Sequence, residues 1–208
     1  MRAVLVVVFL LVQSLTVFAQ RYVFYLHGKI VEDQGPTARN EAFGAYEYDN
    51  ILAALRKDHF IVISECRKPD TDVKEYARKI AGQVDSLLKT GVKPGNITVI
   101  GASKGALIAM QASSYIKNPH VNFVFMSSCN DYAFSSFSDL SLCGNILSIY
   151  EKSDPGNGSC AKFRDRSKLS IPHYKDLEIN TGLKHGYLYK PIPEWMAPAV
   201  SWANENYN

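Results

Sequence analysis

One short segment of the chain has the residue types of a nucleophile held at a sharp turn. Residues 101–105 read G-A-S-K-G, which fits the pattern G-x-S-x-G. A five-residue match is weak evidence by itself, so the residues on both sides must support a strand–turn–helix. The apolar run 97–100 precedes it and the apolar run 105–110 follows, which predicts a strand, a turn and a helix. Ser103 would then be strained and face a cleft, with the helix N-terminus beneath it. An ordinary tight turn is the alternative interpretation.

The two glycines of this segment have a steric explanation. In a strand–turn–helix unit the start of the helix passes close to the end of the strand. A β-carbon at Gly101 or Gly105 would collide with that backbone, so both positions favour glycine.

A serine hydroxyl is a poor nucleophile at neutral pH, so Ser103 needs a base, and the base needs an orienting acid. His185 is a candidate base, because it lies in a loop after the strand predicted at 174–179, where nearby glycines allow the ring to reach Ser103. His173 is the rival, and an ordinary surface histidine is the other interpretation. The remaining three histidines lie before the motif or at the opposite edge of the predicted sheet: His27, His59 and His120.

For the acid, Asp154 directly follows the strand predicted at 146–150. Pro155 and Gly156 then mark a turn that can hold the carboxylate inward. Asp131, after the preceding strand, is the rival. An aspartate that caps a turn is the alternative for either residue.

Short apolar segments alternate with amphipathic ones along the rest of the chain. Helices are predicted where apolar residues recur at i, i+3, i+4 and i+7. Strands are predicted at 22–26, 60–63, 97–100, 121–126, 146–150 and 174–179, and helices at 48–55, 73–88, 107–116 and 194–205. This alternation predicts an α/β fold, with a parallel sheet covered by helices on both faces.

Three long connections, at 28–47, 127–144 and 153–172, leave the carboxyl ends of the predicted strands. Ligands of such sheets bind at that edge. The aromatic stretch 132–137 is expected to lie near the site there, as a wall of the cleft or as ordinary packing.

Over residues 21–206 the chain resembles the α/β-hydrolase superfamily. The resemblance rests on residues 101–105, on the pair His27-Gly28 after the first strand, and on the order Ser, Asp, His. It implies a minimal α/β-hydrolase fold of about six mainly parallel strands in the order 2-1-3-4-5-6. The usual two preceding antiparallel strands are missing, and no insertion is long enough for a cap domain.

The resemblance also implies roles for individual residues. Ser103, Asp154 and His185 would form a catalytic triad that hydrolyses an ester through an acyl-enzyme. The backbone N–H groups of Lys29 and Lys104 would form the oxyanion hole, with Gly28 as the alternative to Lys29. His27 and Gly28 would bind substrate. No metal or organic cofactor is expected.

The sequence leaves open the role of the Lys104 side chain and the identity of the substrate. The Lys104 ammonium either attracts an anionic substrate or lies on a solvated face. The substrate is a small or polymer-attached ester. A catalytically inactive, hydrolase-like binding protein is the second hypothesis. A Rossmann-like nucleotide binder is disfavoured, because G-x-G-x-x-G and a P-loop lysine motif are both missing.

The 208-residue chain has 47% hydrophobic and 21% charged residues, a composition that excludes disorder, collagen, coiled coil and multi-span membrane protein. A net charge of +3 without a long basic run gives no reason to expect a nucleic-acid partner.

Residues 1–19 have the layout of a secretory signal: Arg2, an apolar run, and Ala19 before the expected cleavage site. A buried strand or an uncleaved anchor is the alternative. We expect residues 20–208 to form a single domain, secreted or periplasmic.

Export would permit disulfides among four cysteines, with one bridge plausible within the last three; buried free thiols are the alternative. The cysteines are Cys66, Cys129, Cys143 and Cys160. Two N-glycosylation sequons begin at Asn96 and Asn157.

Overall fold

The computed structural model describes residues 20–208, and the expected signal peptide at 1–19 lies outside them. Six strands form one sheet in the order β4-β1-β5-β6-β7-β8. Every pairing in it is parallel. Counted along the chain within this sheet, the order is 2-1-3-4-5-6, as expected. The strands are β1 (Arg21–Leu26), β4 (Phe60–Ile63), β5 (Ile97–Ala102), β6 (Asn122–Met126), β7 (Asn145–Glu151) and β8 (Tyr174–Ile179).

The central strands β5 and β6 are mainly apolar and wholly buried, because both faces of the sheet are covered. Along β1, Val23 and Tyr25 enter one hydrophobic core, whereas Phe24 and Leu26 enter the other. The two-residue alternation of a strand thus supplies two cores from one continuous apolar run.

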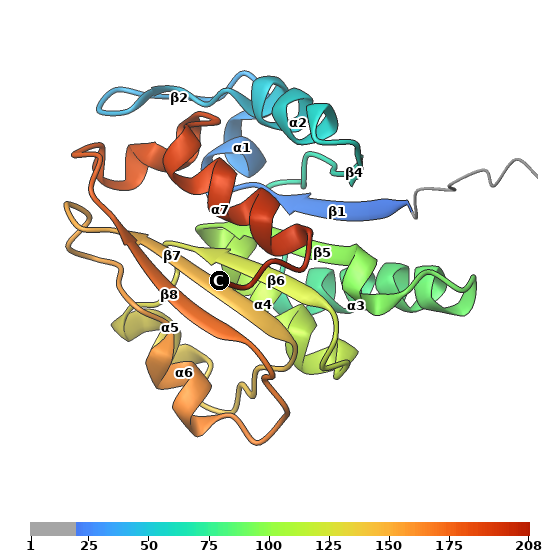
Figure 1. Cartoon of the computed structure of the whole chain (residues 1–208). Helices are drawn as coiled ribbons and strands as arrows, with labels where there is room; N and C mark the ends of the chain where they lie inside the picture. Colours follow the sequence, from blue (N-terminus) through green and yellow to red (C-terminus); the bar gives the residue numbers. More distant parts are fainter. Residues whose placement is uncertain (1–19) are drawn as a thin grey trace, which may run out of the picture.

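Helices cover both faces of the sheet (Figure 1). On one face lie α1 (Lys29–Gln34), α2 (Tyr48–Lys57) and α7 (Pro193–Ala203). On the other lie α3 (Val73–Lys89), α4 (Lys104–Ile116), α5 (Asp131–Ser136) and α6 (Ala161–Arg166). Two 3-10 helices, η1 (Pro94–Asn96) and η2 (Lys184–Tyr189), complete the set. Among residues 20–208, no helix has the length and apolar character needed to cross a membrane.

The segments expected to be long loops contain short elements of their own. These are α1, α5, α6 and a small antiparallel hairpin of β2 (Arg39–Asn40) and β3 (Gly44–Ala45). Each of these helices has six residues. Fewer than two turns cannot display an apolar period, so the sequence pattern misses them.

A disulfide joins Cys129, which follows β6, to Cys160, at the start of α6. This bridge agrees with the expectation of one disulfide among Cys129, Cys143 and Cys160, for which the sequence left the pairing open. Cys143 is a buried free thiol, and Cys66 is an exposed one.

Candidate active site

The turn between β5 and α4 holds Ser103 in a strained backbone conformation. Its φ is 54° and its ψ is −119°, a region that non-glycine residues rarely adopt. The Ser103 N–H donates to the carbonyl of Met126 on the next strand, at 2.9 Å. Its hydroxyl makes no capping hydrogen bond to α4. The strained turn therefore leaves the hydroxyl free to face the cleft.

The close approach expected around the two glycines is present. A β-carbon at Gly101 would overlap the backbone of Gly105 and Ala106, and one at Gly105 would overlap the carbonyls of Leu26 and His27. Because the obstacles are backbone atoms, neither position can accept a side chain without moving β1 or α4.

His185 and Asp154 lie in contact. His185 is in η2, and its Nδ1 is 2.8 Å from Oδ2 of Asp154, which follows β7. Burial alone would raise the pKa of Asp154, but the interactions with His185, Asn157 and Ser127 together lower it. With Nδ1–H donated to the carboxylate, Nε2 of a neutral ring remains as a proton acceptor.

Ser103 and His185 both line one cavity of about 640 Å³. No hydrogen bond between their side chains is present in the described part of the chain. Catalytic hydrogen bonds are often long before substrate binds, so this separation is compatible with proton transfer in a complex.

The rival acid and base lie elsewhere. Asp131 is exposed in the first turn of α5, and the partner of His185 is Asp154. The His173 ring stacks on Tyr207 with their centroids 4.1 Å apart. The structure thus brings together the pair favoured by the sequence.

A neighbouring amide orients the Asp154 carboxylate. Asn157 Nδ2 donates to Asp154 Oδ2 at 3.1 Å, and Asn157 Oδ1 accepts from Asn130 Nδ2 at 3.1 Å. Both asparagines also line the cavity. The sequon at Asn157 therefore lies within the site, while Asn96 of the other sequon is buried.

Glu151, at the end of β7, was not singled out from the sequence, yet it joins the acid loop to the base loop. Its buried carboxylate accepts five hydrogen bonds. Thr181 donates to Oε2 from its N–H at 2.9 Å and from its hydroxyl at 2.7 Å. Ser153 donates to Oε1 from its N–H and hydroxyl, at 3.1 and 3.0 Å, and the Gly182 N–H donates to Oε1 at 3.4 Å. Burial acts to raise the pKa of Glu151, but the donors from Thr181 and Ser153 lower it overall.

The loop after β1 lies against the serine turn. Gly28 caps the N-terminus of α1, and a β-carbon there would lie 3.6 Å from Ser103 Cβ. Lys29 and Lys104 are the first residues of α1 and α4. Amides at such positions have no acceptor within their own helix. The expected oxyanion donors are therefore the backbone N–H groups at the start of α1, directly after Gly28, and at the start of α4, directly after Ser103.

The structure does not place the His27 ring at the cleft. The ring is fully buried and absent from the cavity lining. The Arg67 N–H donates to its Nε2 at 3.0 Å, so Nδ1 carries the proton and donates to the Gly28 carbonyl at 2.8 Å. Burial, with the nearby Arg67 charge, lowers the pKa of His27 to about 4. His27 thus holds the loop. Gly28 is likewise absent from the cavity lining, whereas Lys29, the next residue, belongs to it.

The cavity wall combines polar and apolar side chains. Tyr132 and Phe137 of the aromatic stretch line it, as expected, together with Val73 and Leu107. Tyr132 is 67% exposed, so its ring lies at the cavity mouth. Within residues 20–208, no cluster of three or more His, Cys, Asp or Glu side chains could hold a metal ion.

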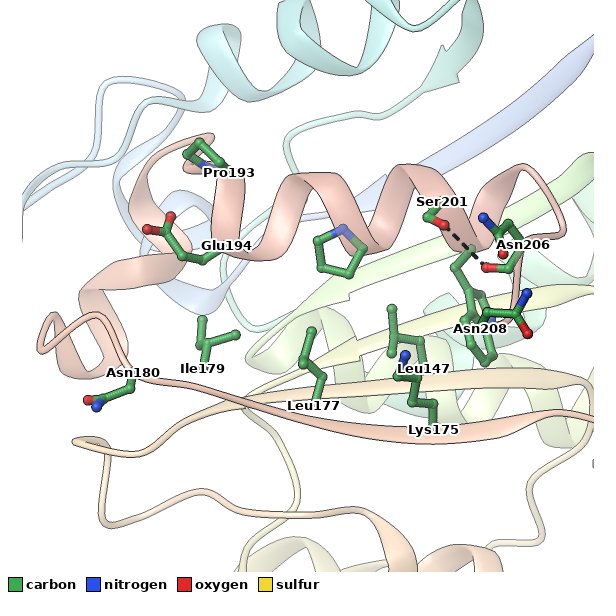
Figure 2. A pocket seen from close by; sticks show the side chains of 12 residues that line it. Leu147, Lys175, Leu177, Ile179, Asn180, Pro193, Glu194, Ser201, Asn206 and Asn208 are labelled. Carbon is green, nitrogen blue, oxygen red and sulfur yellow. Dashed lines mark hydrogen bonds between the residues drawn. The ribbon is translucent and has the colours of Figure 1, made fainter.

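A second pocket, of about 430 Å³, lies between β8 and α7 (Figure 2). Leu147, Leu177 and Ile179 form part of its apolar floor, and Lys175, Glu194 and Asn206 belong to its polar lining. None of its lining residues is a candidate for the chemistry described above.

The parallel sheet and the strand–turn–helix at Ser103 define the α/β-hydrolase fold. No cap domain is inserted within residues 20–208. Comparison with solved structures agrees with this class. An esterase from Pyrococcus furiosus matches with a TM-score of 0.60 and 15% identity, over 90% of this chain and 83% of that one.

Two further structures show the same likeness. A serine hydrolase without a lid from Xanthomonas campestris matches with a TM-score of 0.58 and 14% identity, over 92% of this chain and 85% of that one. A hydrolase described as YdeN-like, from Pectobacterium atrosepticum, matches with a TM-score of 0.57 and 12% identity, over 91% and 94%. At these identities the likeness concerns the fold. No model of a known protein family matches the chain. No curated protein matches it either.

Proposed function

We propose that the protein is a serine hydrolase that cleaves a carboxylic ester through Ser103, His185 and Asp154. The observation that carries the proposal is the convergence of three distant residues. Ser103 and His185 line one cavity, and His185 Nδ1 is 2.8 Å from the Asp154 carboxylate. The hydrolases and esterases among similar structures support hydrolysis as the reaction class.

In the acylation step, His185 Nε2 takes the Ser103 hydroxyl proton as Oγ attacks the ester carbonyl. The resulting tetrahedral oxyanion collapses, and the alcohol leaves with the proton from His185. Asp154 keeps the ring oriented and stabilises the transient imidazolium. In the second step, water attacks the acyl-enzyme while His185 takes its proton, and the proton returns to Ser103 as the acid leaves.

The oxyanion would accept hydrogen bonds from the backbone N–H groups of Lys29 and Lys104, with Gly28 keeping the approach open. Fixed donors at that position stabilise charge that develops only in the transition state. The closeness of Gly28 to the nucleophile supports this role: a β-carbon at position 28 would lie 3.6 Å from Ser103 Cβ, so the start of α1 adjoins Ser103.

The cavity sets the class of ester. Its volume of about 640 Å³ and its place at an uncapped edge suit a small ester or an acyl group attached to a polymer. Tyr132 at the mouth offers an aromatic surface to the part of the substrate that stays outside.

Replacing the nucleophile tests the proposal. With 4-nitrophenyl acetate, Ser103→Ala should lower kcat/KM by roughly 10³-fold or more, because the rest of the site cannot supply a nucleophile. A fluorophosphonate should label the wild type at Ser103 Oγ with loss of fluoride. The matched control is Ser86→Ala, at an exposed serine of α3, which should keep wild-type activity and labelling.

Two outcomes would overturn the proposal. A Ser103→Ala protein as active as the wild type would exclude this serine as the nucleophile. A wild type that neither turns over esters nor reacts with the fluorophosphonate would favour the inactive, hydrolase-like binding protein instead.

A further inference from the structure

The side chain of Lys104, next to the candidate nucleophile, does not extend into solvent. Its Nζ forms an ion pair with Oε1 of Glu32 on α1, and the Lys104 side chain is only 17% exposed. Glu32 is fully enclosed, with 0% of its side chain exposed. A buried carboxylate is costly without partners, and Glu32 has further partners besides Lys104.

Arg67, in the loop after β4, is the second cation on Glu32. Its Nε donates to Oε2 at 3.1 Å, and its side chain is also fully buried. The Thr71 N–H donates to Oε1 at 3.1 Å. Burial alone would raise the pKa of Glu32, but the hydrogen bonds from Lys104 and Arg67 lower it, so the carboxylate stays charged. We call Glu32, Lys104 and Arg67 the Glu32 cluster.

The same arginine holds the loop that precedes α1. Its Nη2 donates to the His27 carbonyl, and its backbone N–H donates to the His27 ring at 3.0 Å. Both contacts fix the chain immediately before Gly28 and Lys29. The Glu32 cluster therefore touches each segment from which an oxyanion donor would come.

The two expected donors lie on different helices, and the cluster joins those helices directly. Lys29 and Glu32 share α1, whereas Lys104 begins α4. The Lys104–Glu32 ion pair thus links the side chain of one donor residue to the helix that carries the other. Catalytic donors must keep their geometry to within about 0.5 Å, and such precision needs support from surrounding contacts.

The charge of the cluster has the sign that an oxyanion requires. Two cations and one carboxylate leave a net charge of +1, and His27 beside them is neutral near pH 7. A positive charge fixed in a partly buried environment favours a negative charge that develops nearby.

We propose that the Glu32 cluster is the positioning device of the oxyanion hole, with Glu32 and Arg67 as positioning residues that act through Lys29 and Lys104. This inference rests on the proposed function. It accounts for the lysine after the nucleophile without requiring an anionic substrate.

The central test is Lys104→Met, which removes the ion pair and leaves the backbone donor in place. With neutral 4-nitrophenyl acetate, kcat should fall roughly 10- to 100-fold while KM changes little. A trifluoromethyl ketone, to which Ser103 Oγ adds to form a bound oxyanion, should lose affinity by the same factor as kcat/KM. Lys104→Arg should restore a large part of both quantities.

Two further variants separate positioning from general stability. Glu32→Gln should lower kcat at least as much, because it also weakens the contacts of Glu32 with Arg67 and Thr71. The double variant with Lys104→Met should be no worse than about twofold below Glu32→Gln alone, because Lys104→Met removes only an ion pair that Glu32→Gln has already broken. The matched control is Lys89→Met, which breaks the exposed Lys89–Asp85 pair on α3 and should leave kcat and ketone affinity unchanged.

Three results would overturn the inference. One is a Lys104→Met protein with a lower melting temperature but wild-type kcat and ketone affinity, since that would make the cluster merely structural. Another is a loss confined to an anionic ester such as mono-4-nitrophenyl succinate, which would assign the ammonium to substrate binding. The third is additive losses in the double variant. Failure of the proposed function is recognised separately, by a Ser103→Ala protein that remains active.

Discussion

The protonation of a single buried side chain, His27, is linked to folding. The unfolded side chain has its ordinary pKa of 6.5, whereas burial lowers the pKa in the folded protein to about 4. Between these values the unfolded chain binds a proton that the folded protein does not. Stability therefore falls as the pH drops from about 6.5 to about 4, and His27 causes no further loss below that range.

We predict a corresponding loss of unfolding free energy. At about 1.4 kcal/mol per pKa unit, the pKa difference corresponds to roughly 3 kcal/mol. Urea unfolding at a series of pH values measures it. His27→Gln should flatten the dependence across this range, whereas His120→Gln, at an exposed site, should retain it. Parallel curves for the wild type and His27→Gln would contradict the prediction.

The end of β7 is joined to η2 by Glu151, which connects the segment that carries Asp154 to the segment that carries His185. In Glu151→Gln the new amide group would face N–H donors of Thr181 or Ser153, and part of this contact would be lost. We predict that kcat falls roughly 10- to 100-fold through displacement of His185. The unfolding free energy should drop by about 1–3 kcal/mol.

A spectroscopic measurement distinguishes displacement from simple destabilisation. The proton that His185 Nδ1 shares with Asp154 should give its own NMR resonance in the wild type, and that resonance should weaken or disappear in Glu151→Gln. Glu75→Gln, the same change at an exposed glutamate of α3, is the matched control and should retain the resonance. An unaltered resonance together with wild-type kcat would mean that Glu151 only stabilises the loops.

The long elements were predictable from sequence because their patterns extend over enough residues. The helix predicted at 73–88 is α3, Val73–Lys89, with Asp72 as its cap, and the strand predicted at 174–179 is β8. Six-residue helices are too short to show a period, so α1, α5 and α6 were missed.

Some residues of the candidate site could be predicted from the sequence, and others could not. Ser103, Asp154 and His185 follow the ends of predicted strands, so their convergence could be expected from topology alone. Glu32 and Glu151 could not be found, because acidic residues are usually exposed and their partners lie far along the chain. The contact between Glu32 and Lys104, for example, spans 72 residues. The one weak signal for Glu151 is its position directly after an apolar strand.

The disulfide bears on the compartment in which the protein as a whole folds. Disulfides persist mainly in oxidising environments, and the Cys129–Cys160 bridge connects two loops at the carboxyl edge of the sheet. We propose that the chain is exported and that residues 1–19 are removed. The signal-like pattern of residues 1–19 and the Cys129–Cys160 disulfide support this proposal independently.

Intact mass measurement of the exported protein tests both parts at once. Expressed from the full sequence in a secreting host, the protein should begin at residue 20. When unfolded without reductant, it should be alkylated at Cys66 and Cys143 only, and at all four cysteines after reduction. Cys160→Ser should instead show three alkylated cysteines before reduction, because Cys129 then loses its partner. A mass that includes residues 1–19 would contradict removal of the leader. Alkylation of all four cysteines before reduction would contradict the bridge, and with it the structural argument for export.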